Sequence, residues 1–317
     1  MPRNTGSGSS NSIERQGVRL RGVDVHQRAM TILGYPFARS ALQEECVSYA
    51  SIMVYVEADR APERRVQLAA SLANRFNAAL TGMSALAILP PLVIDGRVLD
   101  EMTGIDVELM KSKLAAADTW FRGMVRNDRL GWRSALDHPG DALVREARYA
   151  DLVVIGNKGR RDGAYRTLDT GEAVLKLGRP ALVVPDGIDT LRGERVVIGW
   201  KDTRESRRAV RDAIPFLQQA SQVIIVEACG PGEQGAALGR LEDIASYLAQ
   251  HRIKAGSKVL LEQKGSGAEQ LLRVAEEEDA DLLVTGGYGH SRLGELIFGG
   301  MTRELLASSP ICCLMSH

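Results

Sequence analysis

The residues best placed to do chemistry are mostly small ones near the carboxyl terminus. Gly286 and Gly289 follow a short apolar run. A second group precedes a segment with helical spacing and comprises Gly299, Gly300, Met301 and Thr302. Glycine lets backbone N–H groups approach an anion closely, and a helix N-terminus adds its positive end. The spacing predicts a phosphate cradle, although glycines also cap helices and turn loops.

Two further side chains are candidates for contact with the same ligand. His290 is next to a loop glycine, where it would either touch a phosphate or lie on the surface. Lys201 follows an apolar run at Arg195–Trp200 and offers an ammonium to a phosphate, but it cannot accept hydrogen bonds from ribose hydroxyls. We count both among the cofactor-binding residues.

Catalytic and metal-binding motifs are missing from the sequence. The five histidines occur in unrelated contexts, and no zinc-protease, serine-hydrolase or Walker-type pattern is present. The four cysteines lack zinc spacing, and Cys312 and Cys313 should point to opposite faces of a strand and pack in the core. The sequence therefore predicts a protein that is not an enzyme, has no metal of its own and lies in the reducing cytoplasm.

The elements that position the glycines belong to a duplication. Residues 280–289 repeat residues 150–159 with six identities, and the same shift of 130 carries Pro180 onto Pro310. Each proline opens an apolar run, and we expect these two runs to pair at sheet edges, within the chain or between chains. The boundaries we predict are 1–48 for a disordered extension, 49–188 for the first domain and 193–317 for the second.

Each copy alternates apolar runs with helical stretches. Ile52–Val56 precedes a stretch in which Val66, Ala69, Ala73 and Phe76 share a helical face, and Asp202–Glu205 resembles a capping pattern. Strands that are apolar on both faces and alternate with helices predict an α/β fold, a doubly wound parallel sheet in each of two tandem domains. Such Rossmann-like sheets bind ligands at the carboxyl ends of their strands.

The first copy has about fourteen additional residues. Its opening strand corresponds to that of the second copy at a shift of 144 rather than 130, so the insertion falls between this strand and the fourth, near Leu89. We regard the inserted segment as a candidate lid. With 40 basic and 40 acidic residues the chain has no net charge, and it has no apolar run of membrane-spanning length, which argues against nucleic acid and membranes as partners.

The motif Gly286-x2-Gly289-x9-Gly299 resembles the nucleotide loop of the universal stress proteins. The segments Trp200–Val210 and His290–Leu306 are also similar to that family, and the likeness extends from about residue 50 to 317. The resemblance implies a tandem universal stress protein with the adenine-nucleotide-binding α/β fold. It also implies ATP as a possible ligand of the second domain, and association through the last strand, either as a homodimer or within the chain.

The chain departs from the family pattern at informative positions. ATP-binding members have Ser or Thr where this chain has Gly300, and Asp where it has Lys201. Anion binding is retained in such a site, so the predicted ligand is an adenine nucleotide or another phosphorylated small molecule. In the first copy the third loop position is Asp169, whose charge opposes a phosphate, while a carboxylate, Glu57, ends the first strand. We expect that site to be empty or altered.

Three functions remain open from the sequence. The first is a non-catalytic stress-response regulator that senses a nucleotide in its second domain. The second is a ligand-free interaction or dimerisation module of the same fold, which the replacements at Lys201 and Gly300 favour. The third is an ATP-pyrophosphate-cleaving synthetase, which would need a Ser-Gly-Gly-x-Asp-Ser loop that Lys201-Asp-Thr-Arg does not match.

Overall fold

The computed structural model describes residues 48–88, 92–94, 97–100, 104–157, 167–262, 266–288 and 300–317. The extension predicted over residues 1–48 therefore lies outside the described residues, apart from Ser48. We call residues 48–188 the first half and residues 193–317 the second half.

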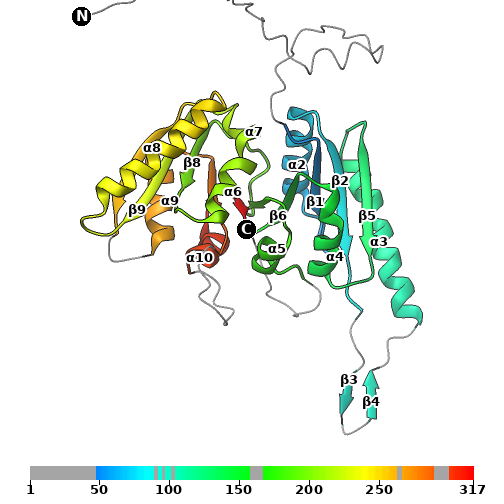
Figure 1. Ribbon diagram of the computed structural model, residues 1–317. Helices are drawn as coiled ribbons and strands as arrows, with labels where there is room; N and C mark the ends of the chain where they lie inside the picture. The colour runs from blue at the N-terminus through cyan, green and yellow to red at the C-terminus, as the bar shows by residue number, and fades with distance from the viewer. Residues whose placement is uncertain are drawn as a thin grey trace, which may run out of the picture. The chain divides into compact units, whose positions relative to one another are not determined.

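The described elements alternate between strand and helix (Figure 1). The first half contains β1 (Ser51–Tyr55), α2 (Glu63–Arg75), β2 (Ala79–Ala85), β3 (Leu92–Ile94), β4 (Arg97–Asp100), α3 (Gly104–Met124), β5 (Leu130–Ala135), α4 (Pro139–Glu146), the 3-10 turn η1 (Ala147–Tyr149), β6 (Leu152–Gly156), α5 (Thr170–Lys176) and β7 (Ala181–Val184). The second half contains β8 (Arg195–Gly199), α6 (Arg204–Asp212), α7 (Ile214–Leu217), β9 (Gln222–Cys229), α8 (Gln234–Gln250), β10 (Gly256–Leu261), α9 (Gly267–Glu277), β11 (Leu282–Gly286), α10 (Gly300–Ser308) and β12 (Cys312–Ser316).

Ten of the strands form one sheet in the order β10-β9-β8-β11-β12-β7-β6-β1-β2-β5. All neighbours are parallel except β12 and β7 at the centre, which pair antiparallel with Leu314 opposite Leu182. The predicted pairing of the two apolar runs is therefore confirmed, and it occurs within the chain. On each side of this central pair the strands follow the same sequence of crossovers.

The position of β12 and β7 corrects the expectation of a homodimer through the terminal strands. β12 already pairs with β11 and β7, and β7 pairs with β6 and β12. A strand has only two hydrogen-bonding edges, so neither strand has an edge left for a second copy.

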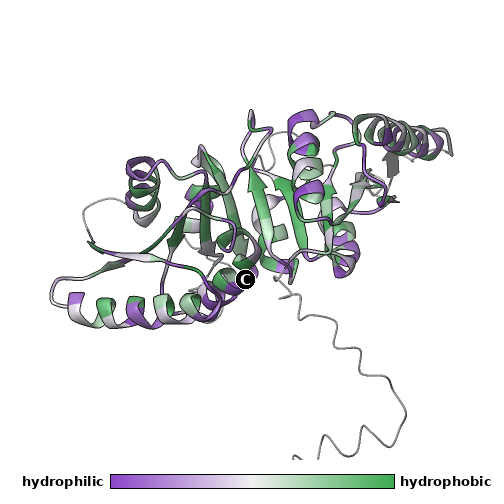
Figure 2. Ribbon diagram, turned by 90° about the horizontal axis from the view of Figure 1, so that it is seen from above, coloured by the Kyte–Doolittle hydropathy of each residue, from purple (hydrophilic) through white to green (hydrophobic). Residues whose placement is uncertain are grey.

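Alternation along each strand sends its apolar side chains to both faces, where helices cover them. Ile52 and Val54 pack in one core with residues of α2, α3, α6 and α8, whereas Met53 and Tyr55 pack in a second core with residues of α4, α5, α9 and α10. Figure 2 shows the hydrophobic strands between helices with polar outer faces. This arrangement confirms the doubly wound α/β fold. Cys312 and Cys313 fall in opposite cores, as predicted.

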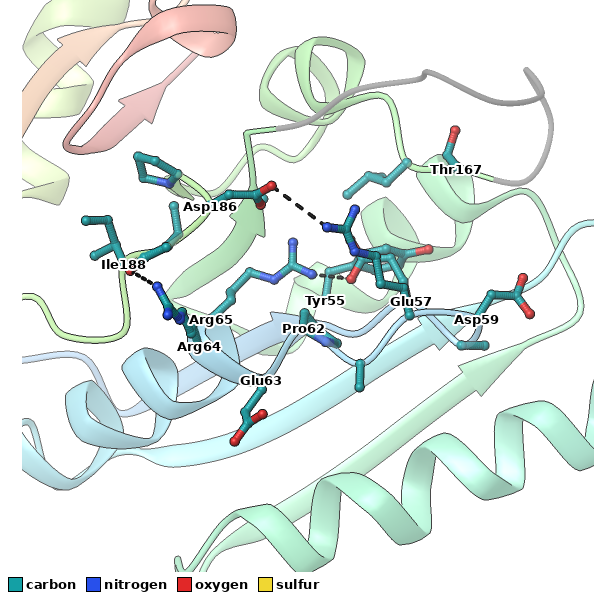
Figure 3. Close-up of a pocket in the computed structure, with 18 of the residues that line it drawn as sticks. Tyr55, Glu57, Asp59, Pro62, Glu63, Arg64, Arg65, Thr167, Asp186 and Ile188 are labelled. Atoms are coloured by element: carbon teal, nitrogen blue, oxygen red, sulfur yellow. Dashed lines mark hydrogen bonds and ion pairs between the residues drawn. The ribbon is translucent and has the colours of Figure 1, made fainter.

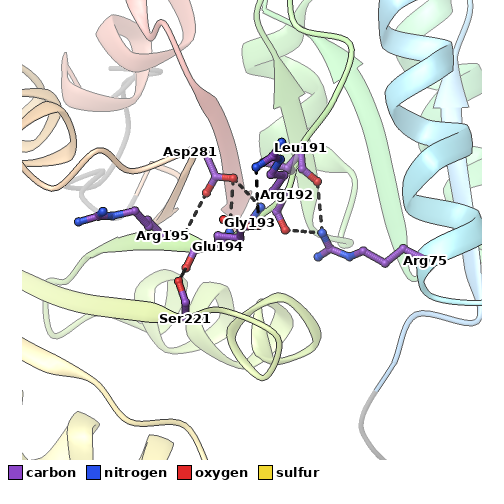
Figure 4. A network of polar contacts seen from close by, with 8 residues as sticks. All are labelled: Arg75, Leu191, Arg192, Gly193, Glu194, Arg195, Ser221 and Asp281. Atoms are coloured by element: carbon purple, nitrogen blue, oxygen red, sulfur yellow. Dashed lines mark hydrogen bonds and ion pairs between the residues drawn. The ribbon is translucent and has the colours of Figure 1, made fainter.

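A repeated aspartate fixes the start of each half's first strand. Asp151 accepts hydrogen bonds from the backbone nitrogens of Ala50 and Ser51, at 2.9 and 3.0 Å. Asp281, 130 residues later, accepts one from Gly193 at 2.7 Å and one from Arg195 at 3.2 Å (Figure 4). Both aspartates satisfy amides that would otherwise lie unpaired where the chain enters the sheet.

The insertion predicted in the first half includes an antiparallel hairpin. Its strands, β3 and β4, form a separate two-stranded sheet. Along the chain they lie between β2 and α3, close to the expected position near Leu89. The helix that follows packs on the main sheet, since Phe121 is fully buried with its ring centroid 5.5 Å from that of Trp132. No helix in the described part of the chain is long and apolar enough to cross a membrane.

Candidate functional site

The site predicted in the second half lies where β8 and β11 end. These strands are parallel neighbours with Gly199 opposite Thr285. Lys201 and Gly286 therefore lie close together at the carboxyl ends of the strands, which we call the carboxyl edge of the sheet. Lys201 is exposed and has no ion-pair partner among the described residues. Its ammonium is therefore available to an anion at that edge.

The start of α10 is next to the loop that leaves β11. Gly300 is exposed at the first position of the helix, and a Cβ added there would meet no atom of the described residues within 4 Å. Met301 is half-buried, and Thr302 is buried and accepts a hydrogen bond from the backbone nitrogen of Tyr288 at 3.1 Å. The Thr302 hydroxyl therefore anchors the loop that leaves β11.

Three of the predicted residues cannot be placed. Gly289, His290 and Gly299 lie outside the described residues, and their contribution to a cradle stays a prediction. Two nearby amides are already satisfied by the protein, because Gly287 donates to the carbonyl of Ser316 at 2.8 Å and Tyr288 donates to Thr302. An anion at this edge would therefore depend on Lys201 and on the open first turn of α10.

Gly286 has a packing role that its place in the motif did not reveal. A Cβ added there would lie 2.7 Å from the backbone nitrogen of Ser206, so the first turn of α6 rests directly on this glycine. That turn is capped by Thr203, whose side chain accepts from Ser206, rather than by Asp202 as the sequence suggested.

Charges in the first turn of α6 are internally paired. The Glu205 carboxylate, only 6% exposed, accepts a hydrogen bond from Arg204. Burial opposes ionisation of Glu205, but the bonds from Arg204 and from the backbone outweigh it and lower its pKa. Trp200 is buried in the core, which favours packing over ligand stacking as its role.

A cavity of about 740 Å³ opens at the equivalent edge in the first half (Figure 3). Its wall is formed by the carboxyl ends of β1, β2, β6 and β7 and by the loop into α2. We call it the Arg65 cavity, because the Arg65 side chain, only 10% exposed, crosses it to reach Glu57.

The length of one loop explains why the cavity opens here. Seven residues separate β1 from α2, whereas four separate β8 from α6. In the second half the helix backbone touches the strand glycine Gly286, but in the first half the equivalent Gly156 faces the guanidinium of Arg65. The longer loop therefore replaces a helix contact with a long side chain and empty space.

The carboxylate predicted to oppose a phosphate in the first half forms a helix cap. Asp169 accepts a hydrogen bond from the backbone nitrogen of Glu172 at 2.9 Å and begins α5. It thus takes an amide at the helix start that a bound anion would use, and places a negative charge there. Gly159 and the nearby Arg160, Arg161 and Arg166 lie outside the described residues.

Comparison with known proteins identifies the second half. The model of the universal stress protein family matches residues 193–317. This half belongs to the universal stress protein family. The predicted family resemblance is therefore confirmed for the second half.

Individual relatives agree with this assignment. A universal stress protein of Synechocystis sp. is 22% identical over 169 residues, which cover 51% of this chain and 56% of that protein, so the match spans little more than half of this relative. A universal stress protein structure from Archaeoglobus fulgidus superposes with a TM-score of 0.64 at 12% identity, covering 83% of this chain and 97% of its own. The structure of a putative universal stress protein from Pseudomonas aeruginosa superposes with a TM-score of 0.50 at 14% identity, covering 84% of this chain and 93% of its own. At these identities the superpositions establish the fold.

Reasoning from the sequence missed the Arg65 cavity. The available signal was the pair Arg64–Arg65 in the first turn of a helix whose next residue, Val66, is fully buried. A basic residue is unusual at the positive end of a helix, so its presence there indicated a nearby carboxylate or ligand.

In the described residues no cluster of three or more histidine, cysteine or acidic side chains has metal-binding geometry.

Proposed function

We propose that this protein is a non-catalytic stress-response regulator that binds an adenine nucleotide, ATP being the first candidate, or another phosphorylated small molecule. The binding site is the edge formed by β8, β11 and α10. In this proposal residues 49–188 and 193–317 are tandem universal stress protein domains, and the protein acts in the cytoplasm, in keeping with its buried free thiols at Cys229, Cys312 and Cys313.

One observation carries the proposal. The exposed ammonium of Lys201 and the first turn of α10, at Gly300, both lie at the carboxyl ends of the parallel strands β8 and β11. A cation combined with the positive end of a helix favours an anion, and a phosphate presents several acceptor oxygens to both. Glu205 does not cancel this field, because it is paired with Arg204.

Calorimetric titration with ATP tests the site. Lys201→Glu should weaken binding by about tenfold or more, because a charge-assisted contact becomes repulsive. Gly300→Val should also weaken it by filling space next to the helix amides, and we expect the fold to be retained, since no described residue occupies that space. Lys254→Glu is the control. Lys254 is exposed and lies before β10, at the amino ends of the strands, and its replacement makes the same change of charge far from the proposed site.

A second candidate function is supported by a different contact. The loop after β11 packs against α5 of the first half, where a Cβ on Gly287 would lie 2.8 Å from Val174 Cγ1 and the Tyr288 hydroxyl approaches Gly171. A loop used to join the halves suits a ligand-free interaction module. Absence of saturable ATP binding to the wild type would reject ATP as the ligand and favour this module.

A further inference from the structure

The Arg65 cavity contains an arginine whose hydrogen bonding is incomplete. Arg65 Nη2 donates to Glu57 Oε2, while Nε is buried and has no partner in the described part of the chain. Nε and Nη2 form one side of the planar guanidinium, which suits two oxygens of a single carboxylate. Glu57 therefore satisfies only half of a two-point site, and a buried donor is left unpaired at a cost.

The cavity's other groups restrict the charge of any ligand. Seven charged residues of the described part of the chain line it, the acidic Glu57, Asp59, Glu63 and Asp186 and the basic Arg60, Arg64 and Arg65. Four negative and three positive charges leave one net negative charge, and Lys113 from α3 neutralises Asp59 at 2.6 Å. Once Lys113 is counted the charges balance, so a triphosphate would bring more negative charge than these cations can match, whereas a single negative charge can take the place of Glu57 on Arg65.

Most of the remaining wall is apolar, Thr167 being a polar exception, and the cavity has the size of a small-molecule site. Tyr55, Ala85, Leu86, Leu168, Val184 and Ile188 contribute to the lining. A volume of 740 Å³ falls within the usual range for small ligands, roughly 300–1,000 Å³. These walls fit an uncharged, largely apolar body attached to the anionic group.

We propose that the Arg65 cavity binds a small molecule with one carboxylate on an apolar body, and that this carboxylate takes the place of Glu57 on Arg65. Glu57 then acts as a built-in competitor. The Glu57 side chain is 34% exposed, so it can turn to solvent when displaced. The Arg65 side chain is only 10% exposed and stays in the cavity. This site is separate from the nucleotide site in the second half and does not depend on it.

Matched probes and variants test the proposal by calorimetry on the full chain. The probes are 3-phenylpropionate, its neutral analogue 3-phenylpropanamide, and ATP. We expect 3-phenylpropionate to bind saturably and the amide not to bind. Glu57→Gln should tighten binding several-fold because the competitor loses its charge, and Arg65→Gln should weaken it by about tenfold or more.

A second ion pair supplies the control. Arg240 and Glu227 form a similar, largely buried Arg–Glu pair between α8 and β9 of the second half. Glu227→Gln and Arg240→Gln should leave 3-phenylpropionate binding unchanged. The proposal is overturned if the probe fails to bind both the wild type and Glu57→Gln, if Glu57→Gln weakens it, or if the amide binds equally well. The second-half site is tested separately. If ATP binds whether or not 3-phenylpropionate is present, and Lys201→Glu abolishes that binding, the second-half site is supported even when the Arg65 cavity proposal fails.

Discussion

At the scale of single residues, position in the fold decides what a charged or small side chain does. Gly286 appears in a ligand motif but also provides the close contact with α6, and Thr302 anchors Tyr288. Asp169, which the sequence marked as an obstacle to phosphate, caps a helix. The motif positions are thus used for packing as well as for any ligand.

Asp212 gives a prediction about pH at this scale. Burial raises its pKa, and its place at the carboxyl end of α6 adds to the cost of its charge, although Ser316 donates a hydrogen bond to it at 2.8 Å. A raised folded-state pKa means that this group favours the native state below the unfolded pKa, about 3.9, and loses that contribution as the pH rises through the folded value.

Asp212→Asn should therefore increase the free energy of unfolding at pH 7, since it removes the buried charge and keeps an acceptor for Ser316. The gain should disappear below about pH 4, where the wild-type carboxyl is protonated in both states. Urea denaturation at neutral and acidic pH measures it, with Asp243→Asn on the exposed face of α8 as the control. A pH-independent effect would contradict this explanation.

At the scale of elements, loop length and insertions distinguish the two halves. The seven-residue connection before α2 opens the Arg65 cavity, whereas the shorter one before α6 brings helix and strand into contact. The β3–β4 hairpin is the other difference, and it pairs only with itself among the described strands. Its role as a lid stays a prediction.

Replacing residues 89–103 with a short Gly-Ser link tests the hairpin. The melting temperature should change by no more than about 2–4 °C, roughly 1 kcal/mol for a protein of this size, because the hairpin forms its own sheet and α3 is retained. Differential scanning calorimetry provides the measurement. Loss of cooperative melting would instead mean that the main sheet requires the hairpin.

At the scale of the whole molecule, the two halves share one sheet and one aromatic cluster. Phe76 of the first half lies edge-on to Phe216 of the second at 5.2 Å, and Tyr49 contacts both rings. Tyr49 also donates to the carbonyl of Asp212 at 2.6 Å, and Arg75 donates to the carbonyl of Leu191 in the connecting segment (Figure 4). These contacts join the halves by packing as well as by strand pairing.

We therefore expect residues 48–317 to unfold in a single transition. Calorimetric and van't Hoff enthalpies should agree, and Phe216→Ala should lower the one midpoint rather than split it, since a buried aromatic truncation costs about 3–5 kcal/mol. Two resolved transitions in the wild type would show that the halves melt independently.

The sequence by itself determined the alternation of strands and helices and the repeat at 130 residues, and it pointed to the strand ends where we propose that a ligand binds. It could do so because periodicity, glycine spacing and the Ala-Asp-Leu repeat are local signals. Only the tertiary structure decided that β7 and β12 pair within the chain, that Gly286 supports α6 and that Arg65 crosses a cavity to Glu57. Each of these depends on which distant segments meet, and that follows from the packing of the whole sheet rather than from any local pattern.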